Sequence, residues 1–195
     1  MSDVDPPTPL GRRERKKAAT RRLISDAATR QFRDRGFDNV TVKQIADEAD
    51  VSPTTVFKHF PSKESLAFDE EPDQEVSLVR AVRDRGPSQT VLDALEEHLL
   101  GGRLLSGHDN SDLSAFLALV DDTPALRDYE RRMLLRRESA VAKVIASSTQ
   151  EALSAAQALG VARFVLQAAD IARDRPDPRQ AFTELMAMLR SGCHV

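Results

Sequence analysis

Apolar residues recur at three- and four-residue spacing along most of the chain, which is the repeat of an α-helix with one buried face. In the first such segment, from about residue 12 to residue 35, this face carries Leu23, Ile24, Ala27, Ala28 and Phe32. Gly36 ends the helix, because glycine readily takes the left-handed conformation that closes helices. No alternating apolar pattern is long enough for a strand. The sequence therefore predicts an all-α protein of about nine to ten helices.

Two short helices follow, each marked by side chains that satisfy free backbone amides. Thr41 and Gln44 form a capping box for a helix over residues 42–49. Ser52 followed by Pro53 begins the next helix, since serine is a good N-cap and proline suits the first helical position.

The connection between these two helices has only about three residues, so they must cross steeply, as in a helix-turn-helix. The second of them runs to about His59. Ser62 then caps a fourth helix, which contains Leu66 and Phe68.

The rest of the chain also has a helical pattern. We expect helices over residues 74–83, 88–100, 110–121, 124–147, 148–173 and 177–190. Capping boxes predict two of these starts, one from Ser148 with Glu151 and one from Asp177 with Gln180.

Charge is distributed unevenly and divides the chain. Residues 1–68 hold 13 Lys and Arg against 10 Asp and Glu, a net of +3, whereas residues 69–195 hold 15 against 21, a net of −6. The basic excess is concentrated in Arg12, Arg13, Arg15, Lys16, Lys17, Arg21 and Arg22. Such a cluster is either a footprint for phosphates or a solvated helix start.

We therefore divide the chain into a disordered tail over residues 1–9, a first domain over residues 10–68 and a second over residues 69–195. The tail carries three prolines and two aspartates and has almost nothing to bury. No run approaches the ~18 apolar residues of a membrane span, and the first residues lack the layout of a secretion signal. We expect a cytoplasmic protein with no membrane association.

Residues 41–66, TVKQIADEADVSPTTVFKHFPSKESL, contain both short helices and their turn. This segment resembles the signature of the TetR family. A threonine opens the second helix, an Ile-Ala pair packs it, a Val-Ser turn follows, and an aromatic-x-His-Phe run ends the third helix before a lysine. The resemblance covers about residues 12–68. It implies a helix-turn-helix DNA-binding domain joined to a helical ligand-binding and dimerisation domain, and hence a ligand-released repressor that binds a palindromic operator as a homodimer.

A helix of about seven residues, braced by its predecessor, is narrow enough to enter the major groove of DNA. Its first turn would present to base edges the side chains of Ser52, Pro53, Thr54 and Thr55. Hydroxyls can bond to bases or phosphates, and threonine methyls can contact the thymine methyl. Val56 and Phe60 should face inward.

The resemblance also implies contacts with the DNA backbone from Thr41, Lys43, Phe57, Lys58, His59 and Lys63. Two positions depart from the family's pattern. Phe57 stands where a tyrosine is usual, and it lacks the hydroxyl that would bind a phosphate. Asp50 stands where glycine is common, but aspartate tolerates the left-handed conformation better than most residues, so the turn should be kept.

In the second domain, the resemblance implies twofold pairing through the last two helices. We expect interface residues at Ala156, Gly160, Phe164, Ile171, Phe182, Leu185, Met186 and Leu189. Apolar residues that could line a pocket are Leu92, Leu95, Leu99, Phe116, Leu119 and Met133. Both sets could instead be simple core.

The run VDDTPALRDYERRMLLRRES resembles a helix of an actinobacterial branch of the family that senses acyl-CoA-like ligands. It suggests an apolar or acyl effector whose anionic end lies near Arg131, Arg132, Arg136 or Arg137. A solvated charged face is the other interpretation of these arginines.

Two other functions are considered. An enzyme would need catalytic or cofactor motifs, but there is no phosphate-binding glycine loop and no HExxH, and the four histidines have no ligand spacing. We therefore expect no catalytic residues, cofactor or metal. A helical interaction protein that has lost DNA binding would keep the fold without salt-dependent affinity for duplex DNA.

Overall fold

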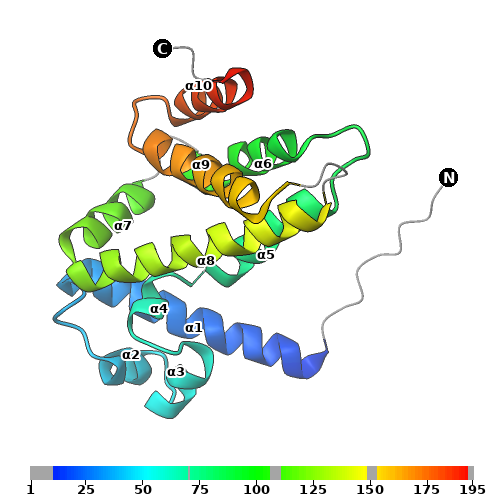
Figure 1. Cartoon of the computed structure of the whole chain (residues 1–195). Helices are drawn as coiled ribbons and strands as arrows, with labels where there is room; N and C mark the ends of the chain where they lie inside the picture. The colour runs from blue at the N-terminus through cyan, green and yellow to red at the C-terminus, as the bar shows by residue number, and fades with distance from the viewer. Residues whose placement is uncertain (1–10, 70, 106–110, 149–152, 193–195) are drawn as a thin grey trace. The chain divides into compact units, whose positions relative to one another are not determined.

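The computed structural model describes residues 11–69, 71–105, 111–148 and 153–192. These residues form ten α-helices and one short 3-10 helix, with no strand among them (Figure 1). The predicted all-α fold is confirmed. The predicted tail over residues 1–9 lies outside the described residues.

The chain divides into two compact units, with a boundary after Asp69. The helices of the amino-terminal unit are α1 (Arg12–Arg35), α2 (Val42–Glu48), α3 (Pro53–His59) and α4 (Glu64–Ala67). Those of the carboxy-terminal unit are α5 (Glu71–Arg83), α6 (Val91–Leu100), η1 (Arg103–Leu105), α7 (Ser111–Asp122), α8 (Pro124–Ser148), α9 (Ala155–Arg173) and α10 (Pro178–Ser191). The predicted boundary lies one residue earlier, after residue 68.

The amino-terminal unit is built on α1, which packs against α2 and α4, while α2 packs against α3. Its buried side chains include Ile24, Ala27, Ala28, Phe32, Phe37, Val40, Ile45, Ala46, Val56, Phe60 and Leu66. Leu23, which the apolar pattern placed on the same face, is 56% exposed. Helices α2, α3 and α4 are short, so packing of these apolar faces provides most of their stability.

Side-chain caps fix where several helices begin. The Thr41 hydroxyl accepts a hydrogen bond from the Gln44 amide, and the Gln44 side chain accepts one from the Thr41 amide. In the same way the Asp177 carboxylate accepts a hydrogen bond from the Gln180 amide at 2.9 Å, with Pro178 at the first helical position. These two predicted helix starts are confirmed.

The predicted start of α9 is wrong. Ser148 is the last residue of α8, and Glu151 lies outside the described residues. The capping box that opens α9 is made by Ser154 and Gln157, six residues further along the chain. Both pairs have the same spacing, so the sequence pattern alone could not choose between them.

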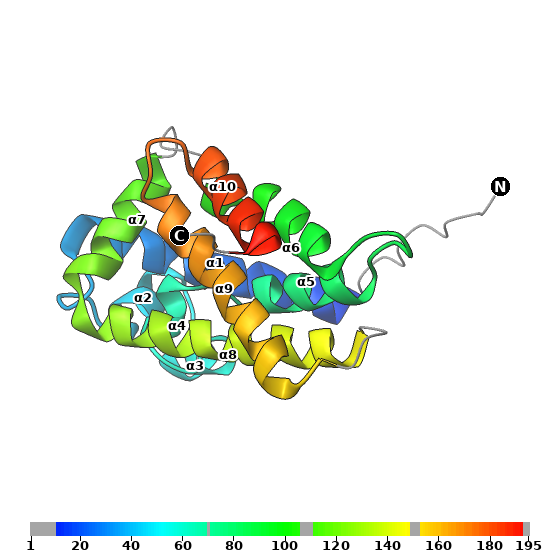
Figure 2. The same ribbon diagram turned by 45° about the horizontal axis from the view of Figure 1, so that its top comes forward.

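The carboxy-terminal unit is centred on α8 and α9, which pack against each other and cross at an angle (Figures 1 and 2). Helix α5 also packs on α8, and α10 lies against α9 and α6. Ion pairs also join the central helices α8 and α9: the buried Glu138 carboxylate lies 2.9 Å from Nε of Arg163, and the Glu130 carboxylate lies 3.1 Å from Nη1 of Arg173. Within the described residues, every helix is too short or too polar to span a bilayer.

Other helix limits differ slightly from the prediction. Helix α5 begins at Glu71, three residues before the predicted start, and α6 begins at Val91 rather than Ser88. The later start of α6 has a clear cause, since Thr90 and Asp93 form its capping box. Phe68 follows α4 rather than belonging to it.

Candidate nucleic-acid interface

The turn between α2 and α3 is short and tightly hydrogen-bonded. Asp50 has a φ of 51°, the only positive φ of a non-glycine residue in the described part of the chain. The Val51 amide then donates to the Ala46 carbonyl at 2.9 Å. Asp50 therefore does what glycine would do here, and the expectation that the turn is kept is confirmed.

Helix α3 has one anchored face and one open face. Val56 and the C-cap residue Phe60 are 0% and 1% exposed, so they fix the helix to the core of the unit. On the other side, Phe57 is 53% exposed, although exposed phenylalanine is uncommon. The exposed side chains of α3 are Pro53, Thr54, Phe57 and Lys58.

Three hydroxyls near these helix starts are engaged in caps. Ser52 Oγ accepts from the Thr55 amide at 3.1 Å and lies 2.9 Å from the Thr55 hydroxyl. The Thr41 hydroxyl donates to Oε1 of Gln44 at 2.9 Å. Thr54 is left as the exposed hydroxyl in the first turn of α3, while Lys43 on α2 is also exposed.

Lys63 has a structural contact that the sequence did not reveal. Its ammonium donates to the Phe37 carbonyl at 2.7 Å and lies 4.1 Å from the centre of the Phe37 ring. Burial lowers the pKa of this ammonium. Lys63 therefore ties the residue before α4 to the loop after α1, and its substitution would disturb folding as well as any phosphate contact.

Arg21 on α1 holds the end of α3. Its guanidinium donates to the His59 carbonyl at 2.8 Å and to the Asp69 carbonyl at 3.0 Å, and lies 2.5 Å from the Asp69 carboxylate. It also stacks over the Phe60 ring at 4.3 Å. The sequence grouped Arg21 with the basic cluster, but here it binds a helix-end carbonyl that has no partner within the helix.

His59 is the last residue of α3, whose carbonyl binds Arg21. Its side chain is half-buried, and burial lowers its pKa, with further lowering by the positive charges of Arg21 and Lys17. These effects favour the neutral imidazole over the charged one. Lys17 is consequently close enough to α3 to act on it electrostatically.

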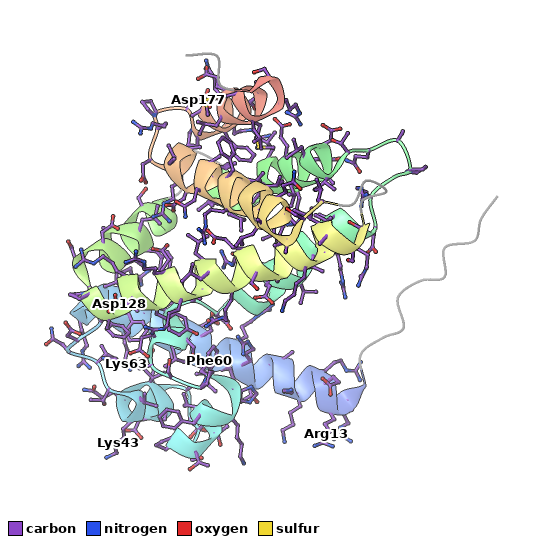
Figure 3. All side chains as sticks on the ribbon, viewed as in Figure 1. Arg13, Lys43, Phe60, Lys63, Asp128 and Asp177 are labelled. Carbon is purple, nitrogen blue, oxygen red and sulfur yellow. The ribbon has the colours of Figure 1, made fainter. Side chains whose placement is uncertain are left out.

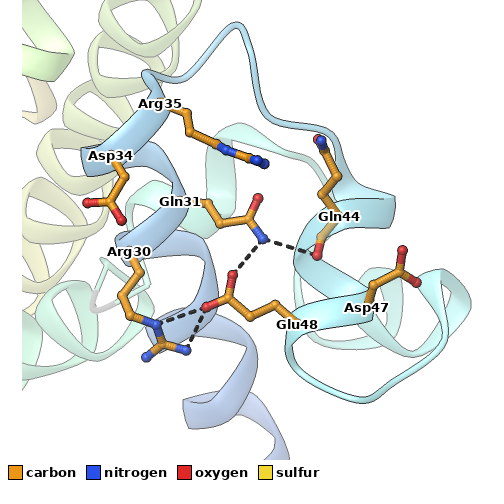
Figure 4. Close-up of a pocket in the computed structure, with 7 residues that line it drawn as sticks. All are labelled: Arg30, Gln31, Asp34, Arg35, Gln44, Asp47 and Glu48. Atoms are coloured by element: carbon orange, nitrogen blue, oxygen red, sulfur yellow. Dashed lines mark hydrogen bonds and ion pairs between the residues drawn. The ribbon is translucent and has the colours of Figure 1, made fainter.

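A polar clamp holds α2 on α1 (Figure 4). The buried Gln31 donates to the Gln44 carbonyl at 3.1 Å and to the Glu48 carboxylate at 2.7 Å, and Arg30 donates to Glu48 at 2.9 Å. These bonds hold the pKa of Glu48 below its usual value, with Gln31 the larger cause. The groove around the clamp has a volume of about 480 Å³. All seven residues that line this groove are polar or charged, so the groove does not suit an apolar ligand.

The side chains around α3 share one side of the amino-terminal unit. Figure 3 shows Lys43 on α2 and Arg13 on α1 both extending to the lower edge of the unit, with α3 between them in this view. In this view α3, the start of α2 and the basic beginning of α1 lie along one edge of the amino-terminal unit. A short exposed helix with cations beside it suits duplex DNA, which is a polyanion with grooves.

The predicted pocket residues differ in burial. Leu95 is 0% exposed and Met133 is 3% exposed, so both are packed into the interior of the unit, and their place in a ligand pocket stays a prediction. Leu92 and Leu99 are partly buried against the main core, and Phe116 and Leu119 on α7 are partly buried as well.

A groove of about 540 Å³ lies elsewhere in the carboxy-terminal unit, between α5 and α8. It is lined by Glu75, Val79, Arg136, Ser139, Ala140, Lys143, Val144 and Ser147. Of the four arginines suggested for an anionic ligand end, only Arg136 lines this groove. In the described residues no group of three or more His, Cys, Asp or Glu side chains is placed to hold a metal ion.

The predicted interface residues fall into three groups. Phe182 and Met186 are both 0% exposed, so they belong to the core of their own subunit and cannot contact a partner; the prediction is wrong for these two. Phe164, Leu185 and Leu189 are partly buried against that core. The exposed members are Ala156, Gly160 and Ile171, the last with 47% exposure.

The three exposed members and the partly buried Phe164 form one stripe on α9. Its successive residues are four, four and seven positions apart. This spacing keeps Ala156, Gly160, Phe164 and Ile171 on the side of the helix opposite the buried alanines. An added Cβ at Gly160 would meet no atom within 4 Å. The glycine is therefore not required by packing inside the subunit.

Comparison with known proteins places these features in a family. The pattern described as "Bacterial regulatory proteins, tetR family" matches residues 24–69. A curated relative, the HTH-type transcriptional regulator TcmR of Streptomyces glaucescens, is 31% identical over 147 residues, which are 72% of this chain. The chain spans about 65% of the length of that relative.

Solved structures of the same fold include the repressor AlkX from Dietzia sp. strain DQ12-45-1b, with 20% identity, coverage of 88% of this chain and 94% of that chain, and a TM-score of 0.54. A SmeT–triclosan complex has 16% identity, coverage of 89% and 90%, and a TM-score of 0.57. The multidrug-binding protein EbrR complexed with malachite green has 20% identity, coverage of 87% and 96%, and a TM-score of 0.53.

Proposed function

The chain is a member of the TetR family of bacterial regulatory proteins, and on this premise we propose that it is a transcriptional regulator that binds duplex DNA through α3. The observation that carries the proposal is the two-sided nature of α3. Its inner residues Val56 and Phe60 are fully packed, while Thr54, Phe57 and Lys58 are exposed on a helix of only seven residues. A helix fixed to the core in this way can enter the major groove without shifting relative to the rest of the unit.

The open residues of α3 have separate roles in this proposal. The Thr54 hydroxyl and methyl reach base edges. The exposed Phe57 ring packs on sugar or on a thymine methyl, since it has no hydroxyl for a phosphate. Lys58 and Lys43 neutralise phosphates, which fixes the register of the protein on DNA. Asp50, Arg21 and the clamp around Glu48 act only by holding α2 and α3 in place.

Substitutions on α3 should separate base readout from phosphate binding. Thr54→Ala is expected to change the preferred bases in a selection from random duplexes, with little change in the salt dependence of binding. Lys58→Ala should weaken binding to all sequences alike and lower the slope of log K against log salt by about 0.9 per contact. The reverse pattern, or no effect of either change, would contradict the assigned contacts.

We further propose that the regulator acts as a homodimer through the exposed stripe of α9. A palindromic operator needs two α3 helices about 34–36 Å apart, and twofold pairing supplies them. Ala156 and Gly160 permit close approach of two helix backbones, and Ile171 adds apolar area that water otherwise covers.

A small-molecule effector is proposed to bind the carboxy-terminal unit and release the DNA. The support is indirect: structures of the same fold hold triclosan or malachite green, and the groove between α5 and α8 combines Val79 and Val144 with the cations Arg136 and Lys143. This composition fits an apolar or acyl chain with an anionic end. The effector can act only by binding the released state more tightly than the DNA-bound state.

Thermal unfolding in the presence of fatty acids and acyl-CoAs tests the effector class. A ligand at 100 times its Kd should stabilise the protein by about 2.7 kcal/mol, enough to raise Tm by several degrees. The rise should shrink in Lys143→Gln if the anionic end lies in the groove. Absence of any shift with every acyl compound would refute this class of effector.

A further inference from the structure

The beginning of α1 carries six cations, and all of them are exposed. They are Arg12, Arg13, Arg15, Lys16, Lys17 and Arg22. Within the described residues none of the six has an ion pair with a carboxylate, although Arg21, Arg30 and Arg33 on the same helix do. No side chain from residue 12 to residue 19 is buried, so this part of α1 extends beyond the core of the unit.

Two of the six cations, Arg13 and Lys17, lie on the side of α1 that is buried further along the helix. Arg13, Lys17 and Arg21 continue, at steps of three and four residues, the stripe that further along buries Ile24 and Ala28. The face that packs against the unit thus changes from apolar to basic at Arg21.

The same stripe is next to α3. Arg21 bonds to the His59 carbonyl at 2.8 Å, and Lys17 lowers the pKa of His59. Arg13 stands eight residues before Arg21, or about 12 Å along the helix axis. That distance equals the rise of roughly three to four base pairs, along which duplex DNA carries one charge per ~1.7 Å.

We propose that Arg13 and Lys17 form a phosphate clamp outside the helix-turn-helix, which binds the DNA backbone beside the base pairs read by α3. This inference rests on the proposed function and extends the DNA surface to a flank that α3 does not reach. The clamp contacts no bases, so it adds affinity and salt dependence without sequence preference. Affinity should therefore be higher for a duplex that extends beyond the bases read by α3 than for one that ends at them.

The test compares two double variants of the full chain that lose the same charge. Arg13→Gln with Lys17→Gln removes the clamp. Arg15→Gln with Arg22→Gln is the control, because Arg15 lies about 200° around the helix from Arg13, on the face away from α3. All four side chains are exposed, and thermal unfolding should be alike in both variants.

Fluorescence anisotropy is measured against salt with a duplex selected from a random library, once with six flanking base pairs on each side and once trimmed to the selected bases. On the flanked duplex the clamp variant should lower the salt slope by about 0.9 per lost contact, hence by about 3 to 4 for a dimer, and the control by less than about 1. On the trimmed duplex the two variants should converge.

Equal slopes for the two variants on the flanked duplex would overturn the clamp while leaving DNA binding intact. Failure of the unsubstituted protein to bind any duplex would instead overturn the proposed function and the clamp together. A second measurement locates the contact directly. A backbone-cleaving iron chelate attached at Arg13→Cys, in a Cys193→Ser background, should cut the flanks, whereas cuts only within the selected bases would contradict the proposed position.

Discussion

Replacing Ile171 by glutamate is expected to leave the subunit folded but to convert the protein into monomers. Ile171 is 47% exposed on the α9 stripe that also carries Ala156 and Gly160, so the substitution removes only the partial packing of a surface residue and not a core side chain. In a twofold interface, two carboxylates would be brought together and buried. Because paired half-sites multiply affinity by about 10²–10⁴, a monomer should bind a paired operator weaker by that factor.

Leu135→Glu provides the matched control for Ile171→Glu. Leu135 on α8 is 51% exposed, so the same change is made at an equally exposed apolar residue outside the stripe. Light scattering should give a dimer for Leu135→Glu and a monomer for Ile171→Glu. A dimer in both cases would place the interface elsewhere, and a monomeric unsubstituted protein would refute pairing.

Replacing Arg21 by alanine is expected to destabilise the amino-terminal unit by about 2–3 kcal/mol. The guanidinium makes hydrogen bonds to the carbonyls of His59 and Asp69, pairs with the Asp69 carboxylate and covers the Phe60 ring. Its loss frees the end of α3, so affinity for DNA should fall as well. The loss should stay below the sum of these separate contacts, because the Arg21 side chain is 34% exposed and partly screened by water.

Arg22→Ala tests whether this effect belongs to the contacts or to the charge. Arg22 is the next residue along the chain and is exposed. Its replacement by alanine removes the same positive charge as Arg21→Ala. Urea unfolding of the full chain should show a lower midpoint for the first transition in Arg21→Ala and almost no change in Arg22→Ala. Similar behaviour of the two variants would show that Arg21 does not hold α3.

Local signals in the sequence were sufficient for the helix-turn-helix. Thr41 with Gln44, and Ser52 with Pro53, determine where α2 and α3 begin through bonds within four residues, so the sequence pattern carries that information. Asp50 likewise adopts the left-handed conformation that its side chain tolerates. The inward orientation of Val56 and Phe60 follows from helical spacing alone.

Contacts between distant segments could not be read in the same way. The family resemblance placed Lys63 among the contacts with the DNA backbone and the charge pattern placed Arg21 in the basic cluster, but their partners Phe37 and Asp69 are 26 and 48 residues away. Spacing along the chain does not reveal such pairs. A signal was present for Arg21 in its place on the buried stripe of α1, where a charged side chain needs a partner.

The carboxy-terminal unit shows a related limit of apolar periodicity. The pattern correctly identified Phe182, Met186, Leu95 and Met133 as apolar face residues, but all four are buried in their own subunit. Periodicity tells which side of a helix is apolar. It does not tell whether that side meets the same chain, a second copy or a ligand, because burial by each of these has the same driving force.

The central claim is that two copies of α3 enter the major groove on one side of a duplex, and methylation protection tests it most directly. Guanine N7 faces the major groove, so bound protein should shield it. We expect protection in two patches whose centres lie about 10–10.5 base pairs, or a multiple of that, apart, and the protection should disappear as salt is raised. A chain that protects no guanine in any selected duplex, at low salt and high protein concentration, would contradict the claim and favour a helical interaction protein.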